Sequence, residues 1–273
     1  MSYNYEQSIW GKGIASLKWS SPPSFRLRQS LHAIKDLPAN STVLEVGSGA
    51  GQFIRAIKEL RPELKCYGCD ISQEALRIAE NDSGGKVEYA LNQGCTLPYP
   101  DKSMDAVLIF DVLEHVDEVD TLLREIRRVL KLGGIFYAFV PCEGDSLSWW
   151  KWLDKVGLKK DVTKKHAGHI NYFSRKQLRN LLDKHGFQKK YTRYSEHIFG
   201  QIIGITSFKM MDRASRKKNL GQINNEAFFT AQDTSKLVRA VKWLVNTSMF
   251  IESSLFSRIP SPNVHMVVTT KDF

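Results

Sequence analysis

Three glycines at alternate positions, Gly47, Gly49 and Gly51, follow a short apolar run that contains the acidic Glu45. Glycine lets the backbone adopt positive φ angles and approach a ligand closely. A strand, a glycine turn and a helix in that order form the nucleotide-binding corner of an α/β sheet. The spacing differs from the dinucleotide motif G-x-G-x-x-G, because Gln52 stands where the third glycine would be. The loop therefore predicts a nucleotide-like ligand that lacks a pyrophosphate.

The elements around this loop alternate between strand and helix patterns. The run from Ala106 to Phe110 is continuously apolar, which is typical of a strand covered on both faces. This alternation predicts an α/β fold with a doubly wound, mostly parallel sheet. We expect strands over residues 42–46, 64–70, 86–91, 106–110 and 135–140, and helices over 24–37, 51–60, 72–80 and 119–130.

The second half of the chain has a less regular pattern. Residues 146–165 are rich in tryptophan and lysine, and residues 198–233 indicate no clear element. Charged side chains interrupt the most apolar helix, so we expect no transmembrane span. We predict helices over residues 174–185 and 234–257, and strands over 187–194 and 264–270.

Basic side chains are concentrated in one region. The chain has 273 residues and a net charge of +10. Residues 151–220 hold 18 of the 39 lysines and arginines, but only 5 of the 29 aspartates and glutamates. This segment favours an anionic partner such as a phosphate-bearing substrate, a membrane surface or a nucleic acid, and a solvated basic face is the alternative.

Targeting and metal-binding signals are weak. Residues 1–6 have neither a basic segment nor an apolar core, so we expect a cytoplasmic protein that could also bind to a membrane surface.

Cys66 and Cys69 have the spacing of half a zinc site, but Cys95 and Cys142 supply no second pair. We therefore expect reduced cysteines near buried strands and predict no metal site.

Several ordered motifs resemble those of class I S-adenosylmethionine-dependent methyltransferases. The resemblance covers about residues 40–187 and is greatest to the type 11 branch, which contains the ubiquinone-biosynthesis O-methyltransferases. It implies a seven-stranded Rossmann-like sheet, with residues 1–141 as the cofactor-binding core and residues 142–273 as a substrate-side helical lid that completes the sheet. The motifs are EVGSGAG at 45–51, Asp70, LPYPD at 97–101, DVLEHV at 111–116, LGG at 132–134 and HINYFS at 169–174.

The resemblance also implies how S-adenosylmethionine is held. Glu45 is expected to hold the cationic amino end, and Asp70 to accept both ribose hydroxyls, as acidic residues do in dinucleotide folds. Asp70 could instead cap the following helix. Gln93 stands where this branch usually has an aspartate, but its amide oxygen can accept the same bond from adenine. The predicted cofactor-binding residues are Glu45, Gly47, Ser48, Gly49, Gly51, Asp70, Ile71, Gln93, Gly94 and Asp111.

Methyl transfer needs in-line placement of the acceptor, exclusion of water and sometimes a base. Histidine titrates near neutral pH, so His115, His166 and His169 are the candidate bases. The resemblance places His115 just after the fourth strand and His169 in the segment that covers the substrate. We predict His169 and His115 as catalytic residues, although each could simply hydrogen-bond a loop.

The predicted acceptor is a small, lipid-linked or glycan molecule that carries an anionic group and is methylated on oxygen. Three tryptophans near Lys151 suit a membrane interface, although packing on the protein's own core is the simpler interpretation. Nucleic acid is a less favoured acceptor, because it depends only on charge, including that of Arg213, Arg216, Lys217 and Lys218. A non-catalytic binding protein with this fold is a further alternative. Gln52 and the segment Leu113-Glu114-His115 disfavour a nicotinamide-dependent dehydrogenase.

Overall fold

The computed structural model describes residues 9, 11, 25–157, 162–217 and 235–271. Its strands are β1 (Thr42–Val46), β2 (Lys65–Asp70), β3 (Glu88–Leu91), β4 (Met104–Phe110), β5 (Leu130–Pro141), β6 (Phe187–Ser195) and β7 (Asn263–Thr270). The longer helices are α1 (Phe25–Ala33), α2 (Gln52–Leu60), α3 (Gln73–Ser83), α4 (Val119–Val129), α7 (Arg175–Lys184), α8 (Ile198–Lys217) and α10 (Lys236–Phe256). Shorter helices are η1 (Leu113–His115), α5 (Trp149–Lys155) and α6 (Val162–Ala167).

The seven strands form one sheet in the order β3-β2-β1-β4-β5-β7-β6. The strands β1 to β5 are parallel, whereas β7 lies antiparallel between β5 and β6. The strand order reverses between β1 and β4, and such a switch point opens a crevice at the carboxyl ends of the strands. The prediction of a seven-stranded, doubly wound and mostly parallel sheet is confirmed.

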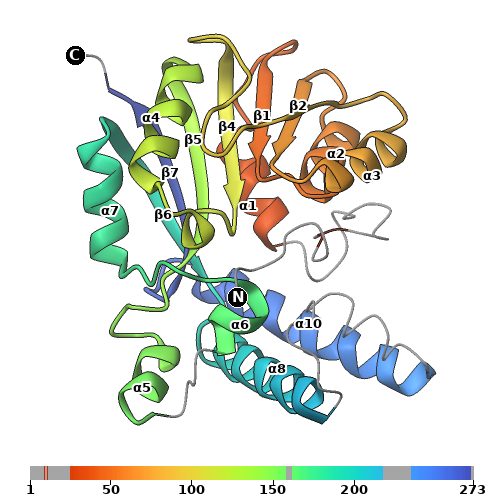
Figure 1. Ribbon diagram of the computed structural model, residues 1–273, viewed down its shortest axis with the longest axis vertical. Helices are drawn as coiled ribbons and strands as arrows, with labels where there is room; N and C mark the ends of the chain where they lie inside the picture. Colours follow the sequence, from red (N-terminus) through yellow and green to blue (C-terminus); the bar gives the residue numbers. More distant parts are fainter. Residues whose placement is uncertain (1–8, 10, 12–24, 158–161, 218–234, 272–273) are drawn as a thin grey trace.

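Helices cover both faces of this sheet (Figure 1). On one face, Leu123 of α4 and Leu178 of α7 pack with the buried side of β4 and β5. On the other face, Leu27 of α1 and Ile54 of α2 pack against Val43 and its neighbours. Covering on both faces explains why the central strands are apolar throughout rather than alternating.

The remaining helices α5, α6, α8 and α10 lie beyond the carboxyl ends of the parallel strands (Figure 1). The predicted helix over residues 234–257 corresponds to α10, except that residue 234 lies outside the described part of the chain. The helix α8 occupies a stretch in which the sequence indicated no element. Within the described residues, no helix combines the length and apolarity needed to cross a bilayer. The division into residues 1–141 and 142–273 stays a prediction.

Candidate functional site

The glycine loop between β1 and α2 has the left-handed backbone that its sequence predicted. The φ angles of Gly47, Gly49 and Gly51 are 72°, 52° and 74°. The backbone N–H of Gly49 donates to Asp70 Oδ2 at 2.8 Å, so the loop is fixed to the end of β2. Asp70 Oδ1 accepts the N–H of Ser72 at 2.9 Å. Asp70 is therefore placed at the centre of this corner by two backbone donors.

Two of the glycines are also required by neighbouring side chains. A Cβ atom at Gly51 would lie 2.2 Å from Tyr89 Oη, and one at Gly47 would lie 2.7 Å from a methyl carbon of Val112. Both distances are far below van der Waals contact. The loop therefore depends on glycine for internal packing as well as for backbone approach to a ligand.

Asp70 does not cap the helix α3 that follows it. The N-cap of α3 is Ser72, whose hydroxyl accepts the N–H of Ala75 at 3.1 Å. Asp70 lies two residues earlier and is half-buried, between the glycine loop and the start of α3. Its carboxylate thus joins the glycine loop to the residue that precedes α3 and does not cap that helix.

The carboxylate of Glu45 is buried inside the protein rather than exposed at the surface. It is buried, and its Oε2 accepts the backbone N–H of Ile54 at 2.8 Å. Burial raises the pKa of Glu45 well above its ordinary value. In the structure this side chain holds the first turns of α2 against β1, and its contact with a cofactor amino group stays a prediction.

The adenine side of the predicted site is open and partly apolar. Ile71 is 48% exposed directly after β2, and so is Leu91 at the end of β3, where it pairs with Asp70 in the parallel register. Gln93 and Gly94 follow in an exposed turn, in which Asn92 Nδ2 donates to the carbonyl of Gly94 at 2.8 Å. Leu91 and Asn92 were not predicted from the sequence, because no motif marks them.

Asp111 lies at the carboxyl end of β4 and forms an ion pair with Arg26 of α1. Its φ angle of 52° is unusual for a residue other than glycine. The guanidinium of Arg26 also lies 3.5 Å from Glu196 Oε1 and 3.9 Å from the centre of the Phe139 ring. The sequence did not single out Arg26 or Glu196, because they are remote from Asp111 in the chain.

His115 and His169, the two predicted catalytic residues, lie side by side in the structure. Their ring centroids are 4.9 Å apart, and His169 Nδ1 lies 2.7 Å from Glu143 Oε1. Thr163 Oγ1 donates to the other oxygen of Glu143 at 3.0 Å. Burial and the neighbouring His169 lower the pKa of His115 to about 3, so its imidazole is neutral at physiological pH.

The third candidate base, His166, is separate from this pair. Its Nε2 lies 3.5 Å from Asp212 Oδ1 of α8, and its side chain is fully buried. Burial lowers the pKa of His166 from its ordinary value. The structure thus assigns His166 to the contact between α6 and α8, which is a structural role.

Among the cysteines, Cys66 and Cys69 are buried in β2 and Cys142 is buried after β5, as expected for reduced side chains. Burial raises the pKa of the Cys66 thiol to about 12. These thiols therefore stay protonated and are poor metal ligands at neutral pH.

The corner formed by β1, β2 and β4 fits S-adenosylmethionine chemically. The half-buried Asp70 can accept ribose hydroxyls, and the exposed Ile71 provides an apolar surface for adenine. The left-handed loop from Gly47 to Gly51 brings the backbone to the same crevice. Dinucleotide-binding folds have a third glycine at the position that Gln52 occupies here. The absence of this glycine agrees with a ligand that has no pyrophosphate.

Comparison with known proteins finds a methyltransferase domain in this chain. A family profile described as "Methyltransferase domain" matches residues 44–138. An uncharacterized protein of Methanocaldococcus jannaschii is 28% identical over 71% of this chain and 87% of its own length. The demethylmenaquinone methyltransferase of Tropheryma whipplei is 37% identical, over 38% of this chain and 42% of its own length. The chain therefore spans less than half of that relative.

Solved structures share the fold at low sequence identity. The geranyl diphosphate C-methyltransferase of Streptomyces coelicolor has a TM-score of 0.52 and 14% identity, with 90% of this chain and 79% of that chain covered. The fold, the glycine loop and the domain match together define a nucleotide-binding transferase of the Rossmann-like class. The match of residues 44–138 to a methyltransferase domain, together with the fold, supports a class I S-adenosylmethionine-dependent methyltransferase of the type 11 branch. The same domain match supports S-adenosylmethionine as the cofactor.

Proposed function

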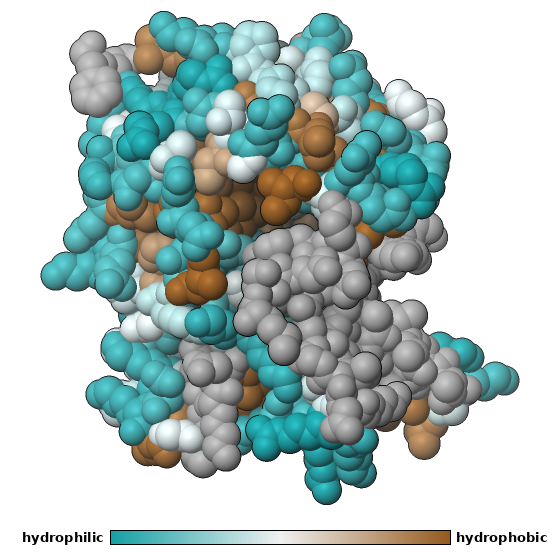
Figure 2. Space-filling view, viewed as in Figure 1, coloured by the Kyte–Doolittle hydropathy of each residue, from teal (hydrophilic) through white to brown (hydrophobic). Residues whose placement is uncertain are grey.

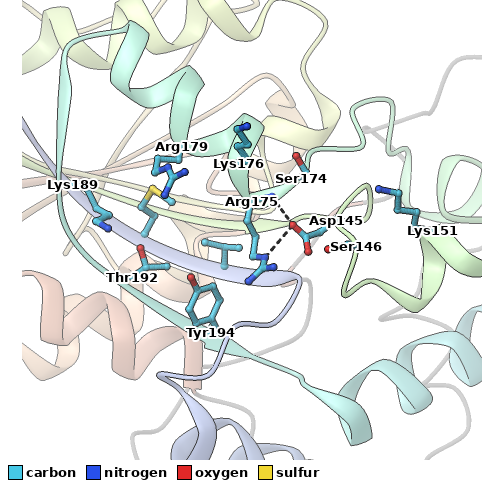
Figure 3. A pocket seen from close by; sticks show the side chains of 12 residues that line it. Asp145, Ser146, Lys151, Ser174, Arg175, Lys176, Arg179, Lys189, Thr192 and Tyr194 are labelled. Atoms are coloured by element: carbon cyan, nitrogen blue, oxygen red, sulfur yellow. Dashed lines mark hydrogen bonds and ion pairs between the residues drawn. The ribbon is translucent and has the colours of Figure 1, made fainter.

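We propose that this methyltransferase modifies an oxygen atom of a small, lipid-linked or glycan acceptor that carries a phosphate or carboxylate group. The supporting observation is a basic cavity of about 430 Å³ between α5, α7 and β6 (Figure 3). We call it the basic pocket. Its cationic side chains are Lys151, Arg175, Lys176, Arg179 and Lys189.

The charge of the basic pocket is only partly neutralised. Asp145 is its one acidic lining residue, and its Oδ2 lies 3.0 Å from Arg175 Nε. No described residue forms an ion pair with Lys176, Arg179 or Lys189. Several like charges around one hollow attract an anion, and arginine suits a phosphate or carboxylate with its planar fork.

The basic pocket is joined to the histidine pair by two short segments. Glu143 contacts His169, and Asp145, two residues further along the loop after β5, contacts Arg175. The same loop is fixed to the second segment, because Gly144 N–H donates to the carbonyl of Phe173 at 2.9 Å. An acceptor with its anionic group in the basic pocket would therefore be held next to the segment that carries His169.

An acceptor hydroxyl must lose its proton as the bond from oxygen to the methyl carbon forms. A side chain that accepts this proton assists the step. Glu143 orients the imidazole of His169 from Nδ1, which leaves Nε2 for the acceptor side. Carbon is the second candidate atom, since one relative is named a ubiquinone/menaquinone biosynthesis C-methyltransferase. That relative matches only 35% of this chain.

The lipid-linked form of the acceptor is favoured by the helices α8 and α10. Among the apolar side chains of α10, Leu237 is 74% and Leu255 is 72% exposed. Apolar surface also interrupts the hydrophilic exterior at the lower end of the molecule, over α5 and the outer end of α10 (Figure 2). Together with Lys236 and Lys242, these side chains suit peripheral contact with an anionic membrane surface.

Nucleic acid ranks below such an acceptor. Within the basic run that favoured it, Arg216 Nη2 lies 2.8 Å from Asp212 Oδ2, which reduces its charge toward an outside partner. Lys218 lies outside the described residues.

The proposal is tested with S-adenosylmethionine carrying a deuterated methyl group, incubated separately with lipid, glycan, small-molecule and RNA fractions of a cell extract. We expect a labelled product whose fragmentation places the methyl group on oxygen. The double variant Arg179→Gln/Lys189→Gln should raise the acceptor KM and leave adenosylhomocysteine binding unchanged, with Lys65→Gln of exposed Lys65 as the control. A carbon-methylated product would refute the oxygen assignment, and labelling of RNA alone would refute the acceptor class.

Catalysis by the histidine pair is tested with His169→Ala. This variant should lower turnover and leave S-adenosylmethionine affinity nearly unchanged, with His32→Ala on the exposed face of α1 as the matched control. If cofactor affinity collapses while turnover at saturation persists, His169 belongs to the cofactor pocket instead.

A further inference from the structure

Glu114, His115 and His169 form a compact set of metal-ligand types beside the cofactor crevice. Each offers one ligand atom, and these atoms all lie within 4.8 Å of one another. The set comes from two segments far apart in the sequence, which are joined because the carbonyl of Glu114 accepts the N–H groups of Ile170 and Asn171 at 2.8 and 3.0 Å. These backbone hydrogen bonds fix the segment that carries His169 against the segment that carries Glu114 and His115.

Glu114 is the unusual member of this cluster. Its side chain is fully buried, and neither carboxylate oxygen has a hydrogen-bond partner among the described residues. Buried carboxylates are normally hydrogen-bonded, paired with a cation or bound to a metal ion. Its nearest ring nitrogen, His115 Nε2, lies 3.9 Å away, too far for a hydrogen bond.

The surroundings of His169 match those of a metal-binding histidine. Glu143 accepts from Nδ1 at 2.7 Å, and Thr163 fixes the second oxygen of that carboxylate at 3.0 Å. A carboxylate on one ring nitrogen sets the tautomer so that the other nitrogen presents its lone pair, as is usual in protein metal sites. Nε2 of His169 is therefore the ligand atom of this side chain.

We propose that Glu114, His115 and His169 bind a divalent transition-metal ion such as Zn²⁺ or Mn²⁺. Two imidazole nitrogens and one carboxylate oxygen suit such ions, whereas Mg²⁺ and Ca²⁺ prefer oxygen ligands alone. In a tetrahedral zinc site with bonds of 2.0–2.1 Å the ligand atoms lie about 3.3 Å apart, so the most widely separated of these ligand atoms must approach by up to about 1.5 Å. Three protein ligands leave a position open for an exogenous oxygen.

The role of this ion rests on the proposed oxygen acceptor. A hydroxyl group bound to a dication loses its proton more readily, and the proton passes to solvent. The acceptor oxygen then forms the bond to the methyl carbon, the bond from that carbon to sulfur breaks, and its electron pair stays on sulfur as a neutral thioether. With the ion bound, Nε2 of His169 is a metal ligand, and the ion takes over the role in proton loss that the oxygen mechanism would otherwise give to this imidazole.

The test is a direct measurement of metal binding. Protein freed of metal with a chelator is titrated with Zn²⁺ by calorimetry and with Co²⁺ by visible absorption, and bound metal is counted by mass spectrometry. We expect one ion per chain. Glu143→Gln should weaken Zn²⁺ binding about 10–100-fold, as loss of a ligand-orienting carboxylate does, and Glu114→Gln and His169→Ala should weaken it more.

The controls separate this site from other ligands. His32→Ala and Cys95→Ser should leave the stoichiometry and affinity unchanged, because neither residue belongs to the cluster. Zn²⁺ binding that persists in folded Glu114→Gln and His169→Ala proteins would overturn the inference. Full methyl transfer in the presence of chelator would overturn it while leaving the proposed function intact. Stoichiometric binding without an oxygen-methylated product would leave the site intact and refute the proposed function.

Discussion

Arg26 of α1 forms an ion pair with Asp111, which lies at the carboxyl end of β4 with a left-handed backbone. The two residues are separated by 85 positions in the chain. The same guanidinium reaches Glu196 at the end of β6 and stacks on Phe139 of β5. One side chain thus links the first helix to three strands next to the crevice.

Replacement of Arg26 should therefore destabilise the protein. In Arg26→Met the carboxylates of Asp111 and Glu196 lose their shared cation, and the free energy of unfolding should fall by about 1–3 kcal/mol, because the pair is partly exposed. Urea denaturation measures the change. Arg28→Met, on the exposed side of the same helix, is the control and should cost much less. Equal losses in the two variants would contradict the role of the ion pair.

Asp70→Asn should weaken cofactor binding more than it weakens the fold. The variant puts an amide N–H₂ where one oxygen now accepts the N–H of Gly49 or Ser72, so the loop loses an acceptor. We expect adenosylhomocysteine affinity to fall by about 1–3 kcal/mol, measured by calorimetry. Glu80→Gln, an exposed position on α3, should bind as the parent does. Unchanged affinity in Asp70→Asn would exclude this carboxylate from the site.

The glycine loop offers a test with a built-in control. Gly51 and Gly85 have nearly the same φ angles, 74° and 76°, but only Gly51 would place a Cβ against Tyr89. Gly85→Ala should cost about 1–2 kcal/mol, the usual cost of a left-handed alanine. Gly51→Ala should cost more and should also weaken cofactor binding, and Tyr89→Phe should recover part of the loss. The absence of rescue in the double variant would show that the Tyr89 hydroxyl is not the obstacle.

The stability of the protein should decline in acid because of His265. This side chain is fully buried between Tyr137 Oη at 2.7 Å and Ser195 Oγ at 2.9 Å. Burial lowers the pKa of His265 well below 6.5. Below about pH 6.5 the unfolded chain therefore binds a proton that the folded protein does not, and the free energy of unfolding falls as the pH drops.

The pH dependence of unfolding isolates this contribution. In His265→Gln the slope of unfolding free energy between pH 7 and pH 5 should decrease by up to about 1.4 kcal/mol per pH unit, the value for one proton. Denaturant titrations at several pH values measure both slopes. Parallel curves for the parent and the variant would mean that another group controls the acid sensitivity.

Short-range patterns in the sequence were sufficient for the cofactor corner. The alternation of strands and helices, the glycines at 47, 49 and 51, and an acidic residue ending β2 depend on neighbouring residues, so they can be read from a single chain. The motifs also singled out His115 and His169, through the resemblance to a family, but their proximity became visible only in the structure. The helix α8 could not be predicted, because apolar and polar residues are spread around it and few of them are buried.

What only the tertiary structure decided is which distant side chains meet at the carboxyl ends of the strands. Arg26, Glu143 and Glu196 carry no motif, yet they contact Asp111, His169 and Arg26 across long stretches of chain. The depth of Glu45 and the unpartnered carboxylate of Glu114 likewise depend on what packs around them. Periodicity and spacing record the local preferences of the backbone, whereas burial and pairing are set by segments that become neighbours only when the sheet is assembled.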